Sequence, residues 1–164
     1  MNPAVRAALR KAGAEARLEQ LDSGTATAED AARAAGCSLA QIVKSIVVIC
    51  DGRPVLALVP GDRRADLDKI ARAVGGDEAR LARAREVEEA TGFAPGAVAP
   101  FPLPRIERVL IDRTLLVHDV VWMGAGSHEH IAALSPAELV RLARATPTDV
   151  VQDPAYDPGT KGDA

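Results

Sequence analysis

The first residue that could do chemistry is a lysine inside an apolar run. Residues 40–50 read Ala-Gln-Ile-Val-Lys-Ser-Ile-Val-Val-Ile-Cys, with Lys44 near the middle. A continuous Val/Ile run that ends at a turn, here Asp51 and Gly52, is typical of a strand buried on both faces. The ammonium of Lys44 therefore either reaches solvent from the edge of a sheet or is held in a cleft, where it could bind a substrate.

A second candidate is the loop of residues 91–102, Thr-Gly-Phe-Ala-Pro-Gly-Ala-Val-Ala-Pro-Phe-Pro, which cannot form a regular helix. Loops of small residues let several backbone N–H groups approach a ligand and point at one oxygen, as in anion nests and oxyanion holes. The same composition also suits a plain connection between strands, so both interpretations stay open.

The third candidate is a group of histidines. His128 and His130 are two residues apart on an expected strand and share a face, so they could bind a metal with His118 as a third ligand. Two exposed histidines at a turn are the commoner meaning of this pattern. The chain has no Gly-x-Ser-x-Gly elbow, no phosphate-binding Gly-rich loop and no Cys/His nucleophile arrangement.

Turn and capping signals divide the chain into alternating helices and strands. Thr27 can cap a helix that runs to Gly36, and Ser135-Pro-Ala-Glu is a capping box for a last helix. From residue 146 onward Pro, Asp, Gly and Thr dominate, which predicts a loosely held tail over 146–164. The expected helices are 3–14, 27–36, 66–74, two short pieces within 78–90, and 135–145; the expected strands are 16–21, 40–50, 54–59, 108–112, 114–123 and 131–134.

Composition narrows the class of protein. A chain of 164 residues favours one domain, and a net charge of −3 argues against coating of nucleic acid, although a local contact remains open. Cys37 and Cys50 are too few for a disulfide framework and are expected to be reduced thiols. No secretory signal or membrane-length apolar run is present, so we expect a cytoplasmic, soluble protein.

The order of these features over residues 15–145 resembles the YbaK/ProX family. The matching strings are Thr-x-Glu-Asp-Ala-Ala from Thr27, Ile-Val-Lys-Ser-Ile-Val-Val, Leu-Ala-Leu-Val-Pro-Gly-Asp, Glu-Val-Glu-Glu-Ala-Thr-Gly-Phe, the Gly/Pro loop and Leu-Ser-Pro-Ala-Glu-Leu. Members of this family are aminoacyl-tRNA deacylases related to the editing domain of bacterial prolyl-tRNA synthetase.

The resemblance assigns roles to particular residues. Lys44 matches the family's active-site lysine, and backbone amides near Gly96 and Ala97 are the implied oxyanion donors. The loop departs from the family pattern at Ala97, Ala99 and Pro102, and an alanine at a position that requires positive φ would be strained. The substrate-binding residues implied by the match are Thr91, Gly92, Phe93, Val98, Ala99, Pro100, Gly126 and His128.

The resemblance also implies the fold and the activity. We expect a single α/β domain over 1–145, with a mixed, strongly curved and barrel-like sheet of about six or seven strands surrounded by helices. The expected activity is trans-editing: hydrolysis of the ester between a small, wrongly attached amino acid and the 3′-terminal ribose of tRNA-Pro or a similar tRNA. Lys44 would position the substrate, and the proton-transfer group stays unassigned.

The expected partners and alternatives follow from that activity. The partners are the aminoacylated tRNA acceptor end and a tRNA synthetase, with no membrane, no DNA, no metal and no cofactor. One alternative is a non-catalytic binding or regulatory module of the same fold. Another is a metal-dependent hydrolase that uses the three histidines.

Overall fold

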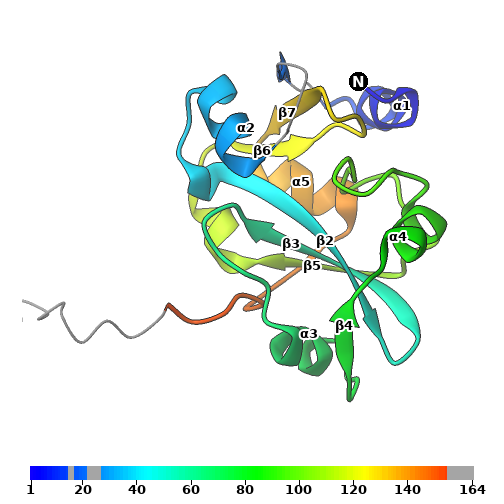
Figure 1. Ribbon diagram of the computed structural model, residues 1–164. Coiled ribbons are helices and arrows are strands. Elements are labelled where there is room, and N and C mark those ends of the chain that lie inside the picture. The colour runs from blue at the N-terminus through cyan, green and yellow to red at the C-terminus, as the bar shows by residue number, and fades with distance from the viewer. Residues whose placement is uncertain (15–16, 22–26, 155–164) are drawn as a thin grey trace, which may run out of the picture.

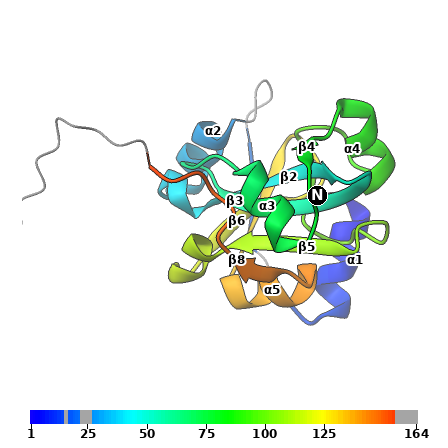
Figure 2. The same cartoon turned by 90° about the horizontal axis from the view of Figure 1, so that it is seen from below.

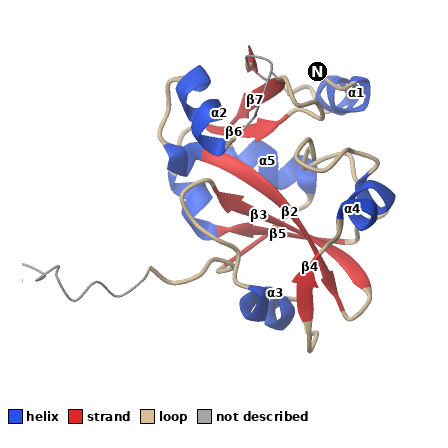
Figure 3. Ribbon diagram, in the orientation of Figure 1, coloured by secondary structure: helices blue, strands red, loops and turns tan. Residues whose placement is uncertain are grey.

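The computed structural model describes residues 1–14, 17–21 and 27–154 (Figure 1). These residues form one α/β domain with five α-helices, two short 3₁₀ helices and eight strands (Figure 3). The helices are α1 (Pro3–Lys11), α2 (Ala28–Ala35), η1 (Leu39–Gln41), α3 (Leu67–Ala73), α4 (Ala84–Thr91), η2 (Arg113–Val117) and α5 (Pro136–Ala143). The strands are β1 (Arg17–Gln20), β2 (Ile42–Cys50), β3 (Arg53–Pro60), β4 (Ala79–Leu81), β5 (Arg108–Asp112), β6 (Val121–Gly124), β7 (His130–Leu134) and β8 (Thr146–Thr148).

The sheet is mixed, as expected. Its strands follow the order β1-β7-β6-β2-β3-β5-β8, and β4 pairs with β2 outside this path. The β2–β6, β3–β5 and β5–β8 pairs are parallel and the others antiparallel. The expected count of six or seven strands is therefore too low. Among the described residues no pairing joins β1 to β8, so the expected closure into a barrel is not shown.

The longest pairing in the sheet is the β2–β3 hairpin. It runs from Val43 opposite Pro60 to Cys50 opposite Arg53. Asp51 (φ 47°) and Gly52 (φ 80°) both have positive φ, which suits the tight two-residue turn that their types predicted. The strands predicted at 40–50 and 54–59 are confirmed as β2 and β3, except that Ala40 and Gln41 belong to η1.

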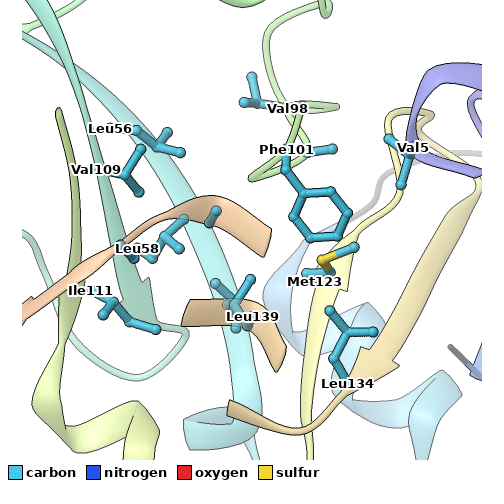
Figure 4. Packing of buried hydrophobic residues seen from close by; sticks show 14 of the residues in the cluster. Val5, Leu56, Leu58, Val98, Phe101, Val109, Ile111, Met123, Leu134 and Leu139 are labelled. Atoms are coloured by element: carbon cyan, nitrogen blue, oxygen red, sulfur yellow. The ribbon is translucent and has the colours of Figure 1, made fainter. Parts of the chain in front are cut away.

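Helices and loops cover both faces of the sheet (Figure 2). The larger core joins α1 and α5 to one face of the central strands, and α3 covers the other face together with Val150 and Val151. Figure 4 shows Phe101, from the Gly/Pro loop, pointing toward Met123 between Val98 and Leu134. The loop is thus packed into the core on one side.

Two predicted segments are wrong. The first part of 78–90 is not helical but forms β4, because the edge of β2 offers it a ladder in which Ile49 faces Arg80. Only the second part is helical, as α4. Strand 114–123 is also wrong in its first half, because the Asp112 carboxylate accepts a hydrogen bond from Thr114 N (3.1 Å) and starts the 3₁₀ turn η2.

The segment after residue 145 is bound to the domain. β8 pairs with β5, Val150 and Val151 are buried, and Val151 forms a bridge with Ala65. The expected boundary at 145 therefore falls too early, since chain up to residue 152 takes part in the fold. Residues 155–164 and Ala16, the first residue of the predicted strand 16–21, lie outside the described residues.

The other predicted elements agree with the structure to within a few residues at each end. In the part of the chain that the structure describes, no helix is long and apolar enough to cross a membrane.

Candidate functional site

A cavity of about 270 Å³ lies where β2 separates from β6. The two strands pair only at Ile42 with Trp122 and at Val43 with Met123. Beyond Val43 this edge of β2 has no partner strand until Val48 pairs with β4, while the opposite edge stays paired with β3. Most of the wall is apolar. The polar side chains that line it are Thr27, Lys44, Ser45, Ser127, His128 and His130.

Lys44 is half-buried in this cavity, and its Nζ donates a 2.6 Å hydrogen bond to the carbonyl oxygen of Arg63. Burial is the main cause of a lowered pKa at Lys44, and the positive charge of Arg64 lowers it further. The carboxylates of Asp62 and Glu29 act in the opposite direction. An ammonium has three N–H donors; one of those of Lys44 fixes its position, and the other two have no partner among the described residues.

Ser45, the next residue, was not singled out by the sequence analysis. Its Oγ is buried and has no hydrogen-bond partner among the described residues. The carbonyl of Val47 accepts from Ala82 N (3.0 Å) on the edge of β2 that faces away from β3. Because N–H and C=O directions repeat every second residue in an antiparallel strand, the backbone of Ser45 faces the same edge, inside the cavity. The cavity lining thus includes a hydroxyl with no partner among the described residues, at the position next to Lys44 in the strand.

The Gly/Pro loop reaches the cavity through Gly96 and Val98. Residues 94–97 form a tight turn in which Ala97 N donates to Ala94 O (3.0 Å), with Pro95 and Gly96 (φ 81°) at the positions they favour in a type II turn. The N–H of Ala97 is therefore occupied, which leaves Gly96 as the candidate oxyanion donor. Among the described residues only Asp51 and Arg144 are non-glycine residues with positive φ, so Ala97 carries no such strain.

The Thr-Gly-Phe signature lies behind the loop and outside the cavity lining. Thr91 Oγ1 donates to Val87 O (2.7 Å) and accepts from Phe93 N (3.0 Å), while Gly92 ends α4 in the left-handed conformation. Phe93 is buried against Gly126, where a Cβ would come within 2.8 Å of its ring. These residues fix the direction in which the chain enters the loop.

Three other expected binding residues, Ala99, Pro100 and Gly126, also lie outside the cavity lining. Ala99 is buried in the core, and Pro100 borders a separate hollow near Leu142. Of the residues expected to act, the cavity brings together Lys44, Gly96, Val98 and His128.

The fold places the three histidines in different surroundings. His128 is exposed at the rim, with its ring 3.6 Å from the position a Cβ would take on Gly96. His130 is half-buried, and its Nδ1 lies 2.9 Å from Ser127 Oγ. His118 does not line this cavity, and the described ranges hold no group of three or more His, Cys, Asp or Glu side chains placed to bind a metal.

A larger hollow of about 740 Å³ lies at the far end of β2, bordered by Cys50, Gly76, Arg105 and Arg108. It contains none of the residues expected to act, so size alone does not identify the site. The sequence analysis did not single out Ser45 and Ser127, which also line the cavity. No local motif marks them, because their place in the lining depends on where neighbouring strands stop pairing.

Comparison with known proteins relates this chain to tRNA editing domains. A family model described as aminoacyl-tRNA editing domain matches residues 22–142. The chain is 34% identical over 130 residues to a proline–tRNA ligase of Nitratidesulfovibrio vulgaris (strain DP4), which covers 79% of this chain and 22% of the ligase. It is 32% identical over 114 residues to the multifunctional Ser/Thr-tRNA deacylase ProXp-y of Escherichia coli (strain K12), covering 66% of this chain and 68% of that protein.

The fold is also similar to that of solved structures. A crystal structure of a candidate trans-editing enzyme for prolyl tRNA synthetase superimposes with a TM-score of 0.84 at 35% identity, covering 93% of this chain and 99% of that one. The chain spans about a fifth of the length of the proline–tRNA ligases it matches.

Proposed function

The chain belongs to the YbaK/ProX-type family of aminoacyl-tRNA editing domains, and we propose that it hydrolyses the ester of mischarged tRNA as a trans-editing deacylase. The observation that carries the proposal is the convergence of Lys44 and Gly96 on one small cavity with a mostly apolar wall. Lys44 is the third residue of β2 and Gly96 lies in a loop about fifty residues later, yet both line this cavity.

The chemistry required by ester hydrolysis fits these groups. A tetrahedral intermediate needs donors at its oxyanion, for which the N–H of Gly96 is suited. The 3′-terminal ribose and ester oxygens need a positively charged donor, which the two remaining N–H groups of Lys44 supply. A water molecule is the nucleophile in this mechanism, and Lys44 has a positioning and electrostatic role.

The proposed substrate carries a small amino acid, such as alanine, serine or cysteine. A cavity of about 270 Å³, narrowed by Trp122, Met123 and Val98, favours small side chains by shape. Shape alone discriminates weakly, since one methylene in an apolar pocket changes selectivity by only about 10 to 200-fold. The names of the relatives point to tRNA-Pro or a similar tRNA, with a synthetase as a further partner.

A panel of mischarged tRNAs incubated with the purified protein tests this function. We expect release of small amino acids and little release of phenylalanine. Lys44→Ala, prepared in the same way, is the control for contaminating esterases. Binding of these tRNAs without turnover would indicate the non-catalytic module, and removal of phenylalanine alone would contradict the proposed pocket.

A further inference from the structure

Ser127 and His130 form a hydrogen-bonded pair inside the same cavity as Lys44. Ser127 Oγ lies 2.9 Å from His130 Nδ1, and both side chains are half-buried in the lining. The backbone around them is also fixed, because Ala125 N donates to His130 O (3.1 Å) and Leu21 N donates to Glu129 O (2.6 Å). The imidazole is therefore held at the start of β7 by its own side-chain and main-chain contacts.

We propose that His130 is the general base of the deacylation and that Ser127 is its positioning residue. This inference rests on the proposed function, which requires a proton acceptor for the attacking water and left that group unassigned. Histidine is the side chain most often used for this step, and a base must lie within hydrogen-bond reach of the water it activates. His130 lines the cavity in which the ester would lie, so it meets the condition of position.

The pair also determines which ring nitrogen is available. When Nδ1–H of His130 donates to Ser127 Oγ, the neutral ring keeps its lone pair on Nε2, which then accepts a proton from water. The water oxygen bonds to the ester carbonyl carbon, and the bond from that carbon to the ribose oxygen breaks. The proton held on Nε2 passes to the ribose oxygen, so the products are a free amino acid and a tRNA with a free terminal hydroxyl.

The other two histidines are less suited. His128 also lines the cavity, but it is exposed at the rim and has no side-chain hydrogen bond to another part of the described chain. His118 follows η2 and does not border the cavity. The geometry therefore distinguishes His130 from the other two histidines, and His118, which does not line the cavity, gives a matched control.

The test compares single-turnover deacylation of one mischarged tRNA by the wild type, His130→Asn and His118→Asn. We expect His130→Asn to slow the chemical step by about 10² to 10⁴-fold, the usual contribution of general acid–base catalysis. His118→Asn should act like the wild type. Thermal unfolding of each variant shows whether a loss reflects misfolding.

The proposed role of Ser127 is tested by measurements that would not change if Ser127 only supported the fold. Ser127→Ala should slow the step by about 5 to 10-fold, the effect expected of one neutral hydrogen bond, without changing the enzyme concentration that gives half the maximal rate. Ser127→Thr, which keeps the hydroxyl, should restore the rate. In the His130→Asn background Ser127→Ala should cost nothing more, because Ser127 acts through His130.

The outcomes separate the inference from the proposed function. A folded His130→Asn with a rate near that of the wild type overturns the inference and leaves the deacylase intact. Ser127→Ala could instead lose as much activity as His130→Asn, and the wild type could accumulate an ester on Ser127. Together these results would identify Ser127, and not water, as the nucleophile and would also overturn the inference. No hydrolysis by the wild type overturns both.

Discussion

The Nζ of Lys44 is hydrogen-bonded to the carbonyl oxygen of Arg63 at 2.6 Å. The guanidinium of Arg63 in turn donates to Gln152 O (2.6 Å), and Gln152 N donates to Arg64 O (2.8 Å). The loop that holds the lysine is thus itself held by the chain after β8. The segment expected to be a loose tail contributes to the position of the central cation of the site.

Replacement of Ser45 should separate stability from activity. The buried Oγ has no partner among the described residues, and an unsatisfied buried hydroxyl costs about 1–3 kcal/mol. Ser45→Ala should therefore keep or raise the free energy of unfolding in denaturant titrations, while deacylation falls if the substrate uses this hydroxyl.

Ser135→Ala is a suitable comparison for Ser45→Ala. Ser135 caps α5 by accepting from Glu138 N (3.2 Å), so its loss should lower stability by about 1 kcal/mol. A similar loss of stability in Ser45→Ala would show that the Ser45 hydroxyl already has a hydrogen-bond partner. It would contradict the view that this hydroxyl is available to a substrate.

The turn at Gly96 should tolerate no side chain. Gly96 has φ 81°, and an L-residue in that conformation costs about 1–2 kcal/mol, so Gly96→Ala should distort the turn and reduce the single-turnover rate. Ala97→Gly is the control, since Ala97 has ordinary φ and an N–H occupied within the turn. Equal loss of activity in both variants would argue against a specific role for the Gly96 amide.

Metal removal should leave deacylation unchanged. The proposed mechanism uses a cation, a backbone amide and water, and the fold keeps His118 away from the cavity that His128 and His130 line. Activity is therefore expected to survive exhaustive EDTA treatment. Stoichiometric zinc in the purified protein, together with activity lost on chelation and regained with zinc, would favour a metal-dependent hydrolase.

The ion pair between β4 and α4 should make stability depend on acid pH. Both guanidinium NH2 groups of Arg80 and the backbone N–H of Arg83 donate to the Glu86 carboxylate, which lowers its pKa to about 2. A depressed carboxyl pKa contributes stability above the usual value of 4.5 that is lost as pH falls through about 2. Glu86→Gln should therefore be less stable than the wild type at pH 6, and the difference should vanish near pH 2.

Glu88→Gln is the matched control for Glu86→Gln. Glu88 is exposed on the same helix and its carboxylate makes no hydrogen bond or ion pair with another described residue. A pH dependence shared by both variants would mean that the Arg80 contact contributes nothing specific.

The sequence was most informative where local and global preferences agree. The Val/Ile run around Lys44, the Asp-Gly turn and the Thr27 cap each predicted an element that the structure contains. The motif order also predicted the family, and Lys44, Gly96, Val98 and His128 do meet in one cavity.

What could not be predicted depends on pairing between distant segments. Ala79–Leu81 is charged and short, and it becomes a strand only because the edge of β2 is free from Val48 onward. Thr146–Thr148 contains a proline, yet the outer edge of β5 accepts it as a strand. The opening beside Ser45 exists because the pairing of β6 with β2 ends at Val43 and the pairing of β4 with β2 begins only at Val48. No local sequence pattern encodes where these pairings end.

The central claim is tested most directly by single-turnover deacylation with Lys44→Ala and Lys44→Arg, measured beside thermal unfolding, with exposed Lys11→Ala as control. The account predicts that Lys44→Ala folds normally, because removal of a partly desolvated cation relieves a burial cost. It predicts a loss of about 2–4 kcal/mol of transition-state stabilisation, or about 30 to 1000-fold in rate. Lys44→Arg should rescue poorly, since its larger planar group cannot keep the same donor geometry. Wild-type rates in Lys44→Ala, or a loss that only follows a lower melting temperature, would contradict the account.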